Sequence, residues 1–97
     1  MTRASVIELL TSHRDEWTTR FGVRSLSLFG SVARDEAGPE SDVDVLVDFG
    51  GPAQFLVHME LVKYLEELLG RRVDVLTVRS LKPRLRERIQ PDLVHVA

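Results

Sequence analysis

Three aspartates in the middle of the chain are the residues best suited to chemistry. Asp42 and Asp44 lie two positions apart in a segment of alternating apolar residues, and Asp74 lies in a second segment of this kind. Side chains two apart on a strand project from the same face, with Cα atoms about 6–7 Å apart. Carboxylates at that spacing can converge on one Mg²⁺ ion or on a metal pair. The pattern predicts a divalent-cation site, and its oxygen ligands favour Mg²⁺ or Mn²⁺ over zinc.

The Asp-x-Asp spacing taken alone has a plainer interpretation, in which Asp42 caps a strand and Asp44 faces solvent. The turn residues nearby and the later Asp74 strand favour the cation site instead. Asp74 could complete the metal shell, or it could act as the base that takes a proton from an attacking hydroxyl. Asp48 shares the parity of Asp44 but lies about 13 Å farther along the strand, so we interpret it as a solvated charge.

A Gly-Ser turn follows the first expected strand. Gly30 permits a sharp turn and a close approach of the backbone to a ligand. Ser31 offers a hydroxyl and an N–H, and exposed N–H groups at the start of a helical turn attract phosphate. Arg34 could pair with a phosphate oxygen, or it could form an ion pair with Asp35 or Glu36. A Gly-Ser pair alone is usually only a turn, so this prediction depends on the carboxylates beside it.

Apolar periodicity predicts the elements that must position these residues. The expected helices cover residues 5–19, 54–69 and 81–89, with one helical turn at 32–36. The expected strands cover residues 25–29, 42–49 and 73–78, with a short final strand or extended tail at 93–96. We expect Gly22 and Gly70 to end the first two helices, and Ser80 to cap the last one, with Pro83 in its first turn.

The order of these elements predicts an α+β (α/β) fold, a small mixed β-sheet with helices packed mainly on one face. The apolar stripe expected on the central helix consists of Phe55, Met59, Val62, Leu65, Leu68 and Leu69. A length of 97 residues fits a single domain covering residues 1–97.

Composition narrows the class of protein. Hydrophobic residues make up 43% and charged residues 29%, which is typical of a soluble globular chain, and we see no signal peptide or membrane span. There is no cysteine, which excludes disulfides and thiolate metal sites and fits a cytoplasmic location.

Charge is unevenly distributed along the chain. Residues 35–49 contain six acids and no base, whereas residues 71–90 contain seven bases and two acids. Arg84 and Arg88 share one face of the last expected helix, and we predict that they contact a partner protein. They could instead steer a triphosphate or simply be solvated. Nucleic acid is a poor partner, because Trp17 and Tyr64 fall on apolar helix faces.

Two segments together resemble the polymerase-β-like nucleotidyltransferases, and most closely the minimal nucleotidyltransferase antitoxins of HEPN/MNT toxin–antitoxin pairs. They are Gly30–Arg34 and Ser41–Val47, followed by the strand with Asp74. The likeness runs from about Ser25 to the end of the chain and includes the basic segment 81–89.

This resemblance implies a function. Asp42 and Asp44 would bind two Mg²⁺ ions, Gly30 and Ser31 the triphosphate, and Asp74 would be the third carboxylate. The reaction implied is transfer of AMP from ATP to a hydroxyl, releasing pyrophosphate. The acceptor implied is a tyrosine of a HEPN-domain ribonuclease toxin, which is neutralised within a hetero-oligomer. Alternatives are an antitoxin that blocks its toxin by contact alone, and a nucleotidyltransferase with a small-molecule acceptor.

Overall fold

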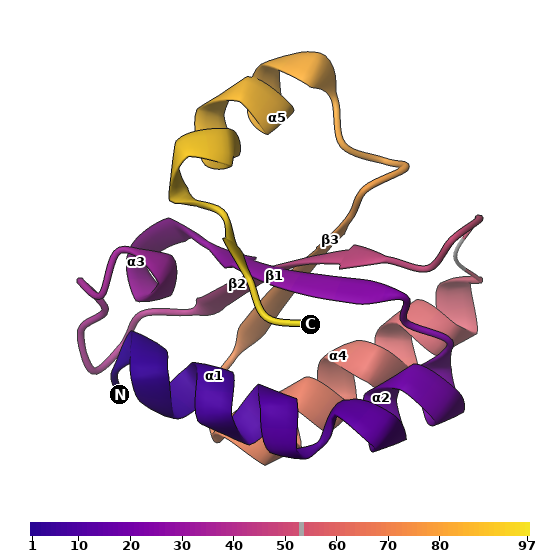
Figure 1. Ribbon diagram of the computed structural model, residues 1–97, viewed down its shortest axis with the longest axis horizontal. Helices are drawn as coiled ribbons and strands as arrows, with labels where there is room; N and C mark the ends of the chain where they lie inside the picture. Colours follow the sequence, from indigo (N-terminus) through magenta and orange to yellow (C-terminus); the bar gives the residue numbers. More distant parts are fainter. Residues whose placement is uncertain (53) are drawn as a thin grey trace.

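The structure is a computed structural model that describes residues 1–52 and 54–97, and within them a mixed four-stranded sheet is flanked by helices (Figure 1). The strands are β1 (Ser25–Phe29), β2 (Val43–Asp48), β3 (Val73–Thr77) and β4 (Val94–His95). Their order in the sheet is β3-β2-β1-β4. β1 is antiparallel to both β2 and β4, whereas β2 is parallel to β3. The predicted mixed sheet and the α+β class are confirmed.

Most of the helices cover one face of this sheet. They are α1 (Arg3–Ser12), α2 (Arg14–Phe21), α3 (Gly30–Ala33), α4 (Phe55–Leu69) and α5 (Pro83–Ile89), the last followed by the 3₁₀ turn η1 (Gln90–Asp92). α1, α2 and α4 lie together below the sheet in Figure 1, whereas α5 lies above it. Among the described residues, no helix has both the length and the apolar character needed to cross a membrane.

The hydrophobic core lies between the sheet and the α1–α2–α4 layer. Alternate residues of β2 point into it, and Val43, Val45 and Val47 are fully buried. The helices supply the opposing side chains, chiefly Val6, Leu10, Trp17, Phe21, Leu61, Leu65 and Leu69. Because strand side chains alternate between faces, Asp44 projects from the opposite face, away from these three helices.

The first predicted helix, at residues 5–19, is wrong as a single element. The chain forms two helices that meet at His13, whose φ of −109° and ψ of 16° are not helical. Buried Trp17 donates from Nε1 to the Leu10 carbonyl oxygen at 2.9 Å, so the indole of α2 packs back against the end of α1. Gly22 ends α2 in the left-handed conformation, as predicted.

Two further predictions are wrong, the helix cap after β3 and the buried stripe of α4. Lys82, not Ser80, is the N-cap of α5, because the Ser80 hydroxyl bonds to Thr77 at 2.6 Å instead. Phe55 and Met59 belong to α4 but are 75% and 50% exposed, since the first turns of α4 extend past the core. Leu61, absent from the predicted stripe, is fully buried.

Candidate active site

The register of the sheet brings the predicted carboxylates together at one end of β2. Asp44 is the direct partner of Asp74 in the parallel pair and of Phe29 in the antiparallel pair. Asp42 immediately precedes β2 and has the same parity as Asp44. Three acidic side chains from two strands therefore face the side of the sheet that α1, α2 and α4 leave uncovered.

Gly30 follows directly on Phe29, so the turn begins next to Asp44. Its φ of 72° lies in the left-handed region that glycine adopts without strain. A Cβ at this position would overlap Oδ2 of Asp44 and lie 3.2 Å from its Cγ. The missing side chain thus lets the backbone at the start of α3 approach the Asp44 carboxylate closely.

The surroundings of Asp44 disfavour its ionised form. Partial burial of the carboxyl raises its pKa, and the negative charges of Asp74 and Asp42 raise it further. Arg34 acts in the opposite direction, with the smallest effect of the four. A bound cation would favour the ionised carboxylates by offsetting this repulsion.

We expect Asp44→Asn to stabilise the protein at about pH 7 in EDTA, because the substitution removes a charge from this cluster. The pKa of Asp44 in the folded protein lies above the usual value of 3.8. At pH values between these two pKa values, the folded protein therefore binds more protons than the unfolded chain. Its stability therefore falls as pH rises through that window. Urea unfolding at about pH 3 and pH 7 tests this, with the gain expected only at the higher pH. A variant less stable than wild type at pH 7 contradicts it.

Ser31 and Arg34 lie on the same short helical segment but differ in their surroundings. Ser31 is partly exposed, and its hydroxyl makes no hydrogen bond within residues 1–52 and 54–97. Arg34 bonds to Glu36 at 3.1 Å and to Asp92 of η1 at 2.8 Å. The ion-pair interpretation therefore describes Arg34, and contact with a phosphate would require it to exchange partners.

The carboxylates fit Mg²⁺ that is shared with a triphosphate better than a closed protein site. In the part of the chain that the structure describes, no three acidic, histidine or cysteine side chains form a complete cation-binding cluster. Mg²⁺ is commonly held by one or two carboxylates, with water and substrate phosphates as its other ligands. Asp44 beside Gly30, with Asp42 two positions earlier on the same face, matches that pattern, and Asp74 is available as a further ligand or a base.

Two arginines near the site were not among the predicted site residues. Arg72 Nε lies 3.2 Å from Oδ1 of Asp42. Arg71 donates to the carbonyl oxygens of Gly38 and Ser41 at 2.8 and 3.3 Å. The sequence alone carried no signal for the Arg72 contact, because it depends on the parallel register that aligns Asp74 with Asp44 and thereby places position 72 beside Asp42.

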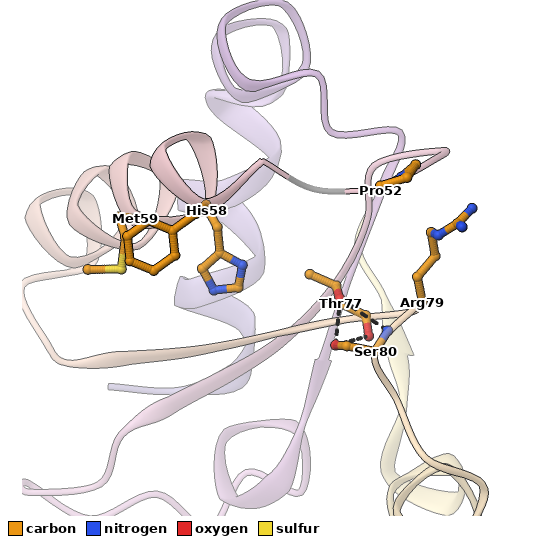
Figure 2. A pocket seen from close by; sticks show the side chains of 7 residues that line it. Pro52, His58, Met59, Thr77, Arg79 and Ser80 are labelled. Atoms are coloured by element: carbon orange, nitrogen blue, oxygen red, sulfur yellow. Dashed lines mark hydrogen bonds between the residues drawn. The ribbon is translucent and has the colours of Figure 1, made fainter.

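A separate hollow of about 540 Å³ lies at the other end of β3. Figure 2 shows Met59 and His58 of α4 on one side of it, and Thr77, Arg79 and Ser80 on the other. Thr77 pairs with Val47, three positions along the strand from the Asp44–Asp74 pair, which is about 10 Å at strand rise. The hollow is therefore not part of the carboxylate site.

Residues 10–94 match the family described as "Nucleotidyltransferase domain". The chain belongs to this family. This nucleotidyltransferase domain is 43% identical over 96 residues to the protein adenylyltransferase MntA of Thermococcus cleftensis, covering 99% of this chain and 97% of that one.

Solved structures share the fold of this nucleotidyltransferase domain. One, described as a candidate minimal nucleotidyltransferase, gives a TM-score of 0.80 at 37% identity, over 97% of this chain and 95% of that one. Another is a chain from the structure of a tri-AMPylated HEPN toxin of Shewanella oneidensis in complex with MNT antitoxin. It gives a TM-score of 0.70 at 18% identity, over 94% of this chain and 71% of that one, which shows the fold alone. The predicted resemblance to minimal nucleotidyltransferases is confirmed.

Proposed function

We propose that this chain is an antitoxin that transfers AMP from ATP to a tyrosine hydroxyl of a HEPN-type ribonuclease toxin, releasing pyrophosphate. The observation that carries the proposal is the meeting of Asp42, Asp44 and Asp74 with the Gly30-Ser31 turn at one end of the sheet. A protein acceptor is supported by the 43% identical relative, which is named a protein adenylyltransferase. The HEPN partner follows from the resemblance stated above, and the absence of cysteine fits a cytoplasmic setting.

Substrate binding is assigned to the residues around the turn. Asp42 and Asp44 hold Mg²⁺, two ions by the resemblance, while Gly30 and Ser31 contact the triphosphate through the backbone and the Ser31 hydroxyl. Bound Mg²⁺ supplies positive charge that neutralises the triphosphate and stabilises the departing pyrophosphate. Asp42 and Asp44 orient the triphosphate by fixing the position of that charge.

The chemical step forms one bond and breaks another at the α-phosphorus of ATP. The acceptor hydroxyl oxygen attacks that phosphorus, and the bond to the bridging oxygen of the β-phosphate breaks, so pyrophosphate leaves. Asp74 is exposed beside Asp44, and its carboxylate accepts the proton that the hydroxyl loses. The products are an AMP–tyrosine phosphodiester and pyrophosphate.

The proposed function is tested with the purified chain, α-³²P-labelled ATP and a purified HEPN-type ribonuclease as the acceptor protein. We expect label on a tyrosine of that protein only when Mg²⁺ is present, with parallel loss of its ribonuclease activity. Inhibition without label would indicate an antitoxin that acts by contact. Absence of both label and inhibition would contradict the proposal and leave a small-molecule acceptor as the alternative.

Ser31→Ala should weaken ATP binding by roughly 10- to 100-fold, because a hydrogen bond to a charged acceptor contributes about 1.5–3 kcal/mol. Calorimetric titration with ATP and Mg²⁺ measures the dissociation constant. Ser25→Ala, at the opposite end of β1 beside Asp48, is the matched control and should bind normally. An unchanged constant for Ser31→Ala would make Ser31 a turn residue only.

The exposed arginines of α5 provide a test of partner docking. Leu85 is half-buried and Ile89 buried, which leaves Arg84 and Arg88 on the solvent side of the helix. We expect Arg84→Glu combined with Arg88→Glu to weaken association with the toxin by about tenfold or more, since each reversal replaces attraction by repulsion. ATP binding should not change. Weaker ATP binding at low salt would indicate steering of the triphosphate instead, and no change in either measurement would contradict both roles.

A further inference from the structure

Two consecutive arginines between α4 and β3 contact the segment that carries Asp42. α4 ends at Gly70, which has a left-handed φ of 66°, and the chain then passes through Arg71 and Arg72 into β3. The Arg72 carbonyl oxygen accepts a hydrogen bond from the Val43 N–H at 3.0 Å, which extends the parallel β2–β3 ladder by one position. The backbone at position 72 is thereby fixed beside Asp42.

The side chains of the pair make different kinds of contact. Arg71 is partly buried and donates to the carbonyl oxygens of Gly38 and Ser41, so it holds the loop that leads into β2. Arg72 makes its contact with a charged group, the Asp42 carboxylate, at 3.2 Å. The loop and both arginines border a hollow of about 250 Å³ that Asp42 also lines. Arg71 thus holds the loop in place, whereas Arg72 offsets the negative charge of the Asp42 carboxylate.

We infer that Arg72 is an exchangeable counter-ion of Asp42, which balances the carboxylate cluster in the cation-free protein and competes with a divalent cation for the same carboxylate. The inference rests on the proposed function, because that function places the cation at Asp42 and Asp44. It makes Arg72 a positioning residue that acts through Asp42 and sets the cation affinity of the site.

The need for a counter-ion follows from the crowding of like charges. Asp44 and Asp74 are register partners, and Asp42 adjoins them on the same face, so three carboxylates repel one another when no cation is bound. A guanidinium on Asp42 offsets part of this repulsion.

The exposure of the pair explains why the contact can exchange. The Arg72 side chain is 79% exposed and that of Asp42 is 45% exposed. Exposed ion pairs are weak because water and salt screen them, so the guanidinium can leave Asp42 with little penalty. A guanidinium that stayed on Oδ1 would repel a divalent cation within a few ångströms, and this repulsion lowers cation affinity.

The test is a calorimetric titration with Mn²⁺, without nucleotide and at low salt, on wild type, Arg72→Gln and Arg79→Gln. Arg79→Gln removes the same charge at the far end of β3, beside the other hollow, and is the matched control. We expect Arg72→Gln to bind Mn²⁺ about three- to tenfold more tightly, because a competing positive charge is gone, and Arg79→Gln to stay within about twofold of wild type. Arg72→Lys, which keeps the charge, should resemble wild type.

Thermal unfolding supplies the second readout. In EDTA, Arg72→Gln should melt below Arg79→Gln, because the carboxylates lose their counter-ion. Saturating Mn²⁺ should close that gap, since the cation then offsets the same charges. A residue with a merely structural role would lower the melting temperature equally with and without Mn²⁺.

The outcomes separate this inference from the proposed function. Equal or weaker Mn²⁺ binding by Arg72→Gln, in a protein whose wild type binds Mn²⁺ and whose Asp44→Asn variant does not, overturns the counter-ion role alone. Wild type that binds no Mn²⁺ without nucleotide overturns the inference alone, because Arg72 then has no bound cation to compete with, whereas the proposed site shares its cation with the triphosphate. An Asp44→Asn variant that binds Mn²⁺ as wild type does overturns the proposed cation site and the inference with it.

Discussion

Asp42→Asn and Asp44→Asn should each lower AMP transfer by roughly 10³-fold or more, because loss of a cation ligand removes several kcal/mol of transition-state stabilisation. The fold should survive both changes. Asp42 is exposed and Asp44 is partly exposed, and each substitution removes a charge from a repelling cluster. Initial rates of label transfer at saturating Mg²⁺ and ATP measure the effect, and circular dichroism verifies the fold.

Asp48→Asn is the matched control for these variants. Asp48 lies on β2 and on the same face as Asp44, but it pairs with Ser25 at the other end of β1 and accepts a hydrogen bond from the Gly50 N–H. Its transfer rate should stay near that of wild type. If Asp42→Asn or Asp44→Asn also turned over at that rate, the carboxylate site would be wrongly located.

Gly30→Ala should be damaging to both activity and stability. The added Cβ would overlap Oδ2 of Asp44, and the φ of 72° would strain any residue that has a side chain. A left-handed conformation costs a non-glycine residue roughly 1–2 kcal/mol, and the overlap adds to this. We expect a loss of about 1–3 kcal/mol in unfolding free energy, because the partly exposed Asp44 carboxylate can shift away from the added Cβ. Displacement of the Asp44 carboxylate should also lower transfer at least tenfold, because the cation ligand moves.

Further variants separate the overlap from the backbone strain. Gly70→Ala places a Cβ at a similar φ of 66°, but no described atom beyond its chain neighbours lies within 4 Å, so only the backbone strain should lower its stability. Gly30→Ala should cost less stability in an Asp44→Ala background than in wild type, because Asp44→Ala removes the overlapped oxygen. Urea unfolding of these variants and of Asp44→Ala alone gives the comparison, since loss of the Asp44 charge itself stabilises the protein. If Gly30→Ala were no less stable than Gly70→Ala, close packing of Gly30 on Asp44 would be contradicted.

Local sequence signals predicted most of the strands and the ends of two helices. Alternating valines in residues 42–49 gave the buried face of β2, and this alternation alone places Asp44 on the opposite face. Gly22 and Gly70 marked helix ends because a left-handed C-cap favours glycine strongly. These features depend on a few adjacent residues, so the chain determines them before any tertiary contact forms.

Other boundaries depended on contacts between distant segments. The break at His13 accompanies packing of the Trp17 indole on the end of α1, and helical periodicity alone runs through it. Exposure of Phe55 and Met59 depends on where α4 crosses the sheet, because the first turns of that helix extend beyond the layer it covers. A periodic pattern specifies a face of a helix but not the length over which a neighbour covers it.

The sequence by itself determined which side chains can do chemistry, namely the Asp-x-Asp pair, the later Asp74 and the Gly30-Ser31 turn. Only the tertiary structure decided how they meet. The parallel register aligns Asp74 with Asp44, and the antiparallel register places the last residue of β1 beside Asp44. The ion pairs of Arg72 with Asp42 and of Arg34 with Asp92 also join segments that are distant in the sequence. The physical reason is that the register and the pairing of charges from distant segments are set when the sheet assembles and its buried face packs, not by any local stretch of chain.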